Sequence, residues 1–176
     1  DLVESENSLL KTIEIADKRA KEDFEKNFNI IKRKFNEIFV ELFGGGKSNI
    51  VIEDEQNPIE SKITIYAQPP GKRVKNITML STGEQTLAAI ALLFAIYETK
   101  PSPFCFMDEI DAPLDDANIE RFLTLLKRLK SKSQILMITH NRRTMEICEY
   151  IYGVTMEEGI SKVISINLQK EVEEWV

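Results

Sequence analysis

Residues 101–120 read PSPFCFMDEIDAPLDDANIE, and this stretch decides the fold. The apolar run Phe104 to Met107 has the length of a buried strand, and an acidic loop rich in turn formers follows it. A helix is predicted from about Asp116 to Leu129. The same order repeats, with a strand from Gln134 to Ile138 and a helix from about Arg142 to Glu149. Strands that alternate with helices predict an α/β fold with a parallel sheet covered by helices.

The sequence on both sides of this core contains further helix and strand patterns. Upstream, a helix is predicted from about Glu84 to Glu98, preceded by two short runs rich in β-branched residues, Asn49 to Glu53 and Ile63 to Ala67. Turn formers bound these runs, so we expect two antiparallel strands. Downstream, short strands are predicted at 150–155 and 163–166. For the closing residues 171–176 no motif decides between a short helix and an extended tail.

The N-terminal part of the chain carries a helical pattern. Six apolar residues alternate four and three positions apart, the spacing of a coiled-coil seam: Phe24, Phe28, Ile31, Phe35, Ile38 and Leu42. An amphipathic helix packed on its own domain explains this short stretch equally well. The run Gly44-Gly45-Gly46 predicts the end of the helix and a turn into a strand.

Composition restricts the class of protein. The chain has 176 residues, 43% of them apolar, enough for one globular domain. A formal charge of −6 gives no overall basic surface for nucleic acid, so a DNA contact would need a local patch or other parts of the molecule. No segment has the length of a membrane span or the layout of a signal peptide, which predicts a soluble protein without membrane partners. Two cysteines without metal-ligand spacing favour the reducing cytoplasm. Because the first residue is Asp1 and not Met, we expect an excised or processed segment.

The sequence Gly46-Lys47-Ser48 invites assignment as a phosphate-binding loop. That motif requires a glycine five residues before Gly46, where this chain has Glu41. The segment also follows a helix and opens a strand, the reverse of a phosphate loop. We therefore predict a helix-ending turn and no complete nucleotide-binding loop in this chain.

Two adjacent carboxylates follow the central apolar strand, in an arrangement that resembles Walker B. Asp108 at the strand end would bind a nucleotide-associated Mg²⁺, directly or through water. Glu109 would point to the γ-phosphate and act as general base for the attacking water. An apolar run followed by Asp-Glu is weak evidence when it stands alone.

Three other motifs support the assignment by their order. Residues 80–85, LSTGEQ, resemble the ABC-type signature at a helix N-terminus, where Ser81 and Gly83 would bind phosphate. Ser81 with Glu84 also forms a capping box, and both roles can coexist. Residues 111–116, DAPLDD, resemble the D-loop, with Asp115 as a nucleotide contact, and His140 at a strand end resembles the switch histidine. Together the four motifs predict an ABC-type ATPase head.

The stretches 91–96 and 100–118, together with 42–46 and 69–72, resemble the head of SMC (structural maintenance of chromosomes) proteins. The resemblance implies that residues 1–42 end a coiled coil and that residues 43–176 form the C-terminal lobe of an ABC-type ATPase head. It implies ATP and Mg²⁺ as cofactors, and an N-terminal half of the same head that supplies Walker A. It also implies a second SMC head in a homodimer, a kleisin subunit and DNA as partners, and a role in chromosome condensation and segregation.

Two departures and two alternatives accompany this interpretation. The signature usually has glycine where Thr82 stands and lysine where Gln85 stands, and the Cβ of Thr82 lies where backbone and phosphate should approach closely. The first alternative is a coil-bearing ABC-type ATPase of DNA repair. The second is a non-enzymatic module that binds a kleisin, although the intact Asp108-Glu109 pair argues against it.

Overall fold

The computed structural model describes residues 2–167, and the chain divides after Pro103 into two units. The first unit contains helix α1 (Leu2–Phe43), strands β1 (Lys47–Ile52), β2 (Ile63–Gln68) and β3 (Lys75–Asn76), the short 3-10 helix η1 (Ile77–Met79) and helix α2 (Thr82–Thr99). The second contains β4 (Phe104–Asp108), α3 (Asp116–Lys130), β5 (Gln134–Ile138), α4 (Arg142–Glu146), β6 (Tyr150–Glu157) and β7 (Ile160–Asn167). Each unit is described on its own.

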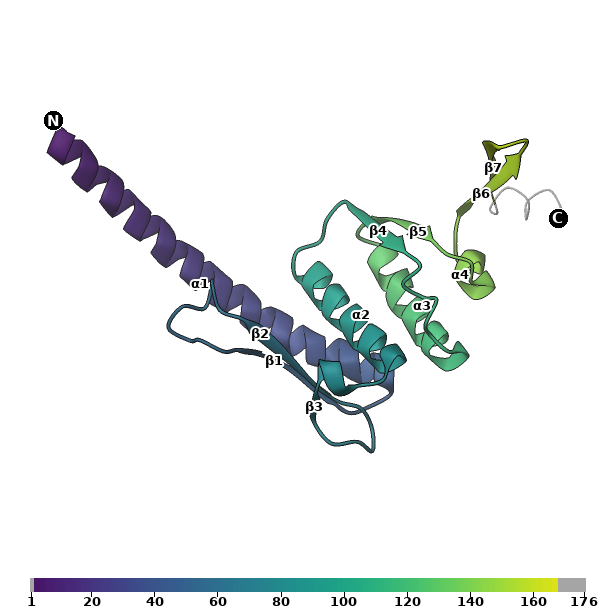
Figure 1. Cartoon of the computed structure of the whole chain (residues 1–176), viewed down its shortest axis with the longest axis horizontal. Helices are drawn as coiled ribbons and strands as arrows, with labels where there is room; N and C mark the ends of the chain where they lie inside the picture. The colour runs from purple at the N-terminus through teal and green to yellow at the C-terminus, as the bar shows by residue number, and fades with distance from the viewer. Residues whose placement is uncertain (1, 168–176) are drawn as a thin grey trace. The chain divides into compact units, whose positions relative to one another are not determined.

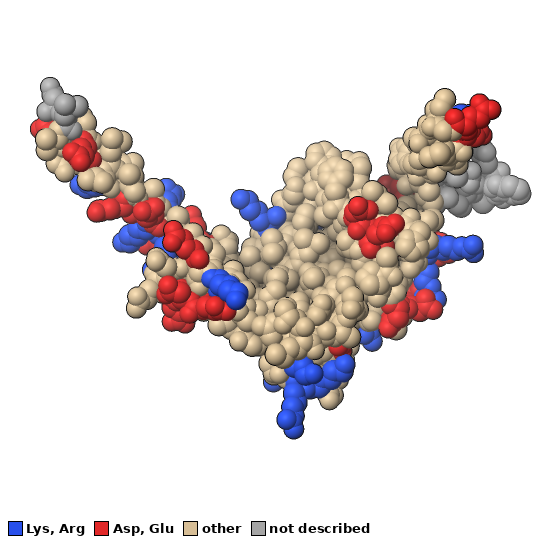
Figure 2. All heavy atoms as spheres, in the orientation of Figure 1, with Lys and Arg blue, Asp and Glu red and all other residues tan. Residues whose placement is uncertain are grey.

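Helix α1 changes character along its length. Its C-terminal turns bury four residues of the predicted seam region inside the first unit: Phe35, Ile38, Phe39 and Leu42. These turns pack against α2 and β1, as expected for an amphipathic helix. Residues 3–20 are exposed on all sides, and Figure 2 shows acidic and basic side chains interspersed along this part of α1. The assignment of 1–42 to a coiled coil stays a prediction.

The turn after α1 confirms that Gly46-Lys47-Ser48 is not a phosphate loop. Helix, turn and strand follow one another in that order, and all three glycines have positive φ, 69°, 140° and 85°. A Cβ at Gly46 would lie 2.2 Å from the carbonyl oxygen of Gln68, so only glycine fits there. The turn lets β1 start directly beside β2.

The predicted antiparallel pair is confirmed and joined by a short third strand. β1 pairs with β2 from Lys47 opposite Gln68 to Ile52 opposite Ile63, and β2 pairs with β3. Ile50 and Ala67 are the buried residues of this sheet. The sheet lies along the C-terminal half of α1 in Figure 1, and β1 contacts that helix.

The second unit contains the predicted parallel pair. β4 and β5 pair in register from Phe104 opposite Gln134 to Asp108 opposite Ile138, and α3 packs against β5. Burial alternates along β4, so one face of the pair is covered. The other face exposes four large apolar side chains: Phe104, Phe106, Leu136 and Ile138. Parallel strands are normally covered on both faces, so this face lacks a covering layer among the described residues.

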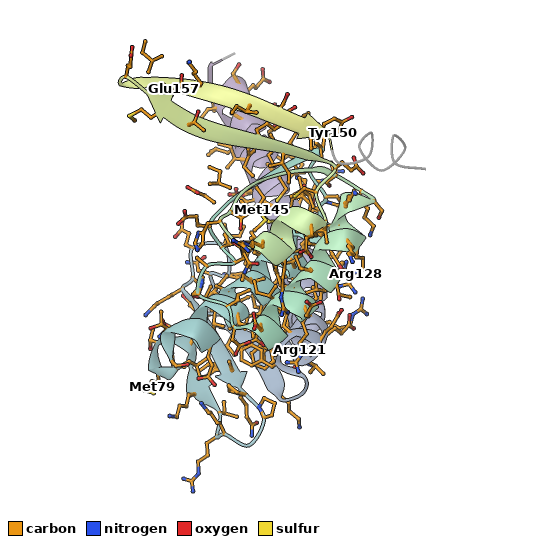
Figure 3. The ribbon with its side chains drawn as sticks, turned by 90° about the vertical axis from the view of Figure 1, so that its right-hand side faces the viewer. Met79, Arg121, Arg128, Met145, Tyr150 and Glu157 are labelled. Carbon is orange, nitrogen blue, oxygen red and sulfur yellow. The ribbon has the colours of Figure 1, made fainter. Side chains whose placement is uncertain are left out.

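The C-terminal elements differ in their bounds from the sequence-based expectation. Helix α4 ends at Glu146, not at Glu149, because the N–H of Cys148 bonds to the carbonyl of Met145 in a turn that leads into β6. β6 and β7 form one antiparallel hairpin, seen with its ends at Tyr150 and Glu157 in Figure 3. Its two-residue turn, Glu158-Gly159, has positive φ at both positions, as such hairpins prefer. The alternatives for 171–176 lie outside the described residues.

Candidate functional site

The carboxyl ends of β4 and β5 bring three of the predicted site residues together. Asp108 ends β4, Glu109 follows it, and His140 lies two residues after the end of β5. Because the two strands are parallel and in register, their ends meet at one edge of the sheet. The N–H of Glu109 bonds to the carbonyl of Ile138 at 2.9 Å and fastens the two ends together. The structure therefore forms one cluster from segments 30 residues apart in the sequence.

Glu109 and His140 face each other across a short gap. The His140 Nδ1 atom lies 3.8 Å from the Glu109 Oε1 atom, within ion-pair range but too far for a hydrogen bond. Both side chains are largely exposed, 59% for Glu109 and 70% for His140. Neither group is locked by the other, so each keeps an accessible polar atom for a ligand.

Glu109 has an unusual backbone conformation. Its φ of 46° lies in the left-handed region, which residues other than glycine, Asn and Asp seldom adopt. The conformation is held by the bond to Ile138 and by a turn in which the Ala112 N–H donates to the Glu109 carbonyl at 3.1 Å. Strained backbone that the surroundings hold in place is common at active sites.

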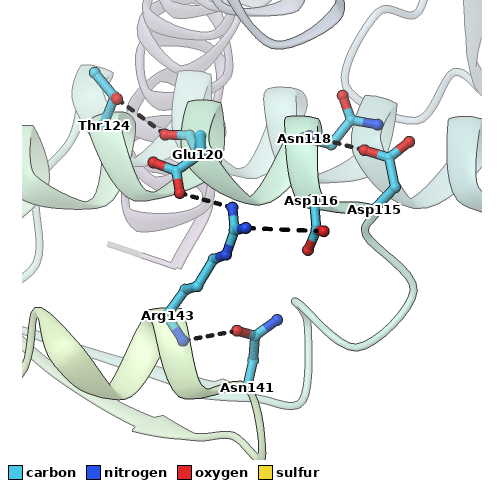
Figure 4. A network of polar contacts seen from close by, with 7 residues as sticks. All are labelled: Asp115, Asp116, Asn118, Glu120, Thr124, Asn141 and Arg143. Carbon is cyan, nitrogen blue, oxygen red and sulfur yellow. Dashed lines mark hydrogen bonds and ion pairs between the residues drawn. The ribbon is translucent and has the colours of Figure 1, made fainter.

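Asp115 has a clear local role in the structure. Its carboxylate accepts a hydrogen bond of 2.8 Å from the Asn118 N–H and caps the N-terminus of α3. Asn141 caps α4 in the same way, through the N–H of Arg143 (Figure 4). Sequence reasoning proposed Asp115 as a nucleotide contact, and that role stays a prediction.

Arg143 joins the two helices of this region. Its guanidinium lies 2.9 Å from the Glu120 carboxylate and 3.8 Å from that of Asp116, both on α3 (Figure 4). The groups are partly to mostly exposed, so the two contacts contribute little energy each. They nevertheless orient α4, which follows the His140 loop, relative to α3.

Ser81 and Gly83 belong to the first unit and form their own cluster at the start of α2. The Glu84 carboxylate accepts from the Ser81 N–H at 3.2 Å and from the Ser81 hydroxyl at 3.0 Å, which confirms the predicted capping box. Gln85 donates from its side chain to the carbonyl of Leu80 at 3.1 Å. The serine therefore begins an ordered helix N-terminus, the type of site at which backbone N–H groups bind phosphate.

Lys72 completes this second cluster and was not predicted from the sequence. Its ammonium lies 2.8 Å from the Glu84 carboxylate. The hydrogen bond from Lys72, with those from Ser81, lowers the pKa of Glu84 below its usual value, against the opposing effect of burial. Residues 69–72 resemble the SMC pattern, but Lys72 and Glu84 are 12 residues apart in the sequence, and only the tertiary structure brings them into contact.

The residues present suit Mg²⁺ bound together with a nucleotide. Asp108 offers an exposed carboxylate at the strand end, and no group of three or more potential metal ligands occurs among the described residues. Mg²⁺ commonly binds through one or two carboxylates, substrate phosphates and water, so one protein carboxylate is sufficient. A dedicated cage for a tightly held metal would require more ligands.

Comparison with known proteins identifies the family. The family model of the RecF/RecN/SMC N terminal domain matches residues 7–162. This chain belongs to that family. The chromosome partition protein Smc of Bacillus subtilis (strain 168) is 45% identical over 177 residues, which cover 100% of this chain and 15% of that protein. The Smc of Methylococcus capsulatus is 46% identical over 174 residues, which cover 98% of this chain and 15% of that protein. The chain thus spans about one seventh of these SMC proteins.

Solved SMC heads share the fold. A crystal structure of the SmcHead bound to the C-winged helix domain of ScpA superposes with a TM-score of 0.83 at 42% identity, covering 89% of this chain and 48% of that one. A second structure is an Smc head domain from Pyrococcus furiosus with an extended coiled coil, bound to the C-terminal domain of ScpA. It superposes with a TM-score of 0.85 at 40% identity, covering 96% of this chain and 42% of that one. The α/β fold predicted from the sequence is confirmed as that of an SMC head. This chain covers less than half of each of these two solved chains.

Proposed function

We propose that this chain is the C-terminal lobe of an SMC-type ATPase head that acts in chromosome condensation and segregation. The observation that carries the proposal is the cluster of Asp108, Glu109 and His140 at the carboxyl edge of a parallel sheet, where α/β proteins bind ligands. The relatives support it, since they are chromosome partition proteins and SMC heads. The Smc partition role belongs to whole proteins, and for this chain it is our proposal.

The bare face of the β4–β5 pair supports an N-terminal half of the same head as partner. Phe104 is 53% exposed and Phe106 is 77% exposed. Phenylalanine side chains in a complete hydrophobic core are buried much more fully than this. Two strands are also fewer than the roughly four to six that sheets usually have. A segment that adds strands and a covering layer would complete the sheet, and the same segment would bring Walker A, which this chain lacks.

The chain's own residues have distinct roles in the proposed hydrolysis. Mg²⁺, when bound together with ATP, would supply positive charge that stabilises the phosphates during hydrolysis. Asp108 would hold this ion, and Glu109 would accept the proton of the attacking water. His140 would donate a hydrogen bond toward the γ-phosphate. Ser81 and Gly83 would contact the γ-phosphate bound to a second head, so that ATP joins two heads and hydrolysis releases them.

The other proposed partners follow from the relatives. A kleisin subunit is proposed because two similar Smc heads are bound to domains of ScpA. A second head and DNA are proposed because a similar chain, 41% identical with a TM-score of 0.74, comes from work on ATP-driven dimerization and DNA stimulated activation of SMC ATPases. Cys105 and Cys148 are free thiols, which suits a cytoplasmic location. No helix in the part of the chain that the structure describes is long and apolar enough to cross a membrane.

The test is ATP hydrolysis by this chain co-expressed with the N-terminal head segment of a chromosome partition protein Smc. The wild-type complex is expected to hydrolyse ATP, and both Glu109→Gln and Ser81→Arg are expected to abolish turnover. ATP-dependent pairs of heads should persist for Glu109→Gln only, as measured by light scattering. A well-folded complex that binds no ATP would support the non-enzymatic, kleisin-binding alternative.

A further inference from the structure

Asp111 is a buried carboxylate that links three segments of the second unit. It is 1% exposed and lies in the loop that follows Glu109. Its Oδ2 atom accepts two hydrogen bonds of 2.6 Å, from the hydroxyls of Thr139 and Thr144. Thr139 follows β5, and Thr144 lies in α4 and is completely buried. One oxygen atom thus fastens the loop after β4 to the loop after β5 and to the next helix.

Thr139 transmits this contact to both sides of His140. Its hydroxyl donates to Asp111 and accepts from the N–H of Asn141 at 3.0 Å. His140 lies between Thr139 and Asn141, so the backbone on either side of the imidazole is held by one hydroxyl group. The bond between the Glu109 N–H and the Ile138 carbonyl fixes the other side of the cluster.

The packing around position 111 does not by itself require a carboxylate. Both threonine hydroxyls donate to Asp111 Oδ2, so the Thr139 hydroxyl oxygen is left to accept from the N–H of Asn141. The second oxygen, Oδ1, is buried without a hydrogen-bond partner among the described residues. Burial of a polar oxygen atom without a hydrogen-bond partner is costly. A neutral side chain would pack the site at lower cost, which argues for a functional reason.

We infer that Asp111 is a positioning residue that sets the separation of Glu109 and His140 by holding Thr139. The inference rests on the proposed function, because that separation matters for hydrolysis only if the two side chains act together on ATP. Asp111 itself touches no reacting atom. Its effect passes through two hydrogen bonds to the backbone that carries His140.

The first arm of the test measures the geometry without ATP. His140 is the single histidine of the 176 residues, so ¹³C labelling of this chain at the histidine Cε1 atom gives one imidazole signal in a two-dimensional ¹H–¹³C NMR spectrum. Thr139→Val keeps the shape of the side chain and removes the hydroxyl, and it is expected to move the signal. Thr139→Ser restores the hydroxyl and should return the signal to its wild-type position. Thr124→Val is the matched control, because the Thr124 hydroxyl donates only within α3, to the Glu120 carbonyl.

The second arm measures hydrolysis by the co-expressed complex described above. Thr139→Val and Asp111→Asn are expected to lower kcat by about 10- to 100-fold with little change in KM, since a small misplacement of catalytic groups has effects of this size. Thr139→Ser and Thr124→Val should keep wild-type kcat. Thr144→Val, which removes the other donor to Asp111, takes the place of Thr139→Val if that variant fails to fold.

The outcomes separate the inference from the proposed function. An unmoved histidine signal in folded Thr139→Val and Thr144→Val overturns the inference, and so does a moved signal with unchanged kcat. Absence of hydrolysis in the wild-type complex overturns the proposed function instead, and the NMR arm then still decides whether Asp111 positions His140.

Discussion

Lys34 and Glu98 join the two helices of the first unit by a half-buried ion pair. The Lys34 ammonium lies 3.3 Å from the Glu98 carboxylate and donates to the Glu98 carbonyl at 2.9 Å. The side chains are only 22% and 16% exposed. A cation near the last turn of α2 also interacts favourably with the helix dipole. The pair helps to fix the position of α2 along the axis of α1.

Lys34→Met is therefore expected to lower the free energy of unfolding by roughly 1–2 kcal/mol, because the carbonyl and carboxylate of Glu98 lose a charged donor in a half-buried place. Urea denaturation measures the change. Arg33→Met, on the same turn, is the matched control, since its pair with Glu37 is exposed at 72% and 63% and should contribute about 0–0.5 kcal/mol. Equal losses for both variants would mean that burial of the Lys34 pair has no effect.

Lys72→Met is expected to destabilise the chain in a pH-dependent way. In the folded protein, Lys72 lowers the pKa of Glu84 below 4.5, the usual value for a glutamate side chain. A lowered pKa gives stability that is fully present above the unfolded value and is lost as pH falls through the folded value. The difference in unfolding free energy between wild type and Lys72→Met should thus be constant from pH 6 to 7 and shrink below about pH 4.5. Arg73→Met, the exposed neighbour, should show no such trend, and a difference that grows on acidification would contradict the assignment.

Glu109→Gly is expected to be more stable than Glu109→Ala, by about 1 kcal/mol, because only glycine adopts a φ of 46° without strain. Thermal unfolding monitored by circular dichroism compares the two. At Ser131, where φ is −68°, the order should reverse, so Ser131→Ala should be more stable to heat than Ser131→Gly. Both Glu109 variants should lack hydrolysis in the co-expressed complex. If Ala is the more stable at both positions, Glu109 is not strained in solution.

Asp115 offers a way to separate capping from nucleotide contact. Asp115→Ala should lower the unfolding free energy by about 1 kcal/mol, since the Asn118 N–H loses its acceptor. Asp115→Asn should keep the cap and the stability, because asparagine caps helices as well as aspartate does. If Asp115 also contacts nucleotide across two heads, Asp115→Asn should weaken ATP-dependent pairing despite normal stability. Wild-type pairing in Asp115→Asn would restrict Asp115 to its capping role.

The sequence determined the elements and their order. Apolar runs bounded by turn formers predicted β4 and β5, and the alternation with helices predicted their parallel pairing. Gly44 to Gly46 marked the end of α1, and Ser81 with Glu84 marked the start of α2. These features depend on neighbours within a few residues, so the local sequence is sufficient to predict them. The carboxyl ends of parallel strands share one edge, and for this reason Asp108, Glu109 and His140 could be expected to meet.

Only the tertiary structure decided which side chains, distant in the sequence, form hydrogen bonds and ion pairs with one another. Asp111 was part of a recognised loop, but its burial and its two threonine donors depend on how β5 and α4 return past the end of β4. Lys72 reaches Glu84 because the β2–β3 turn folds back toward α2. A hydrogen bond to Ile138, 29 residues away, likewise helps to hold Glu109 at its positive φ. Such contacts arise from chain packing across long separations, and no periodicity or spacing in one sequence encodes them.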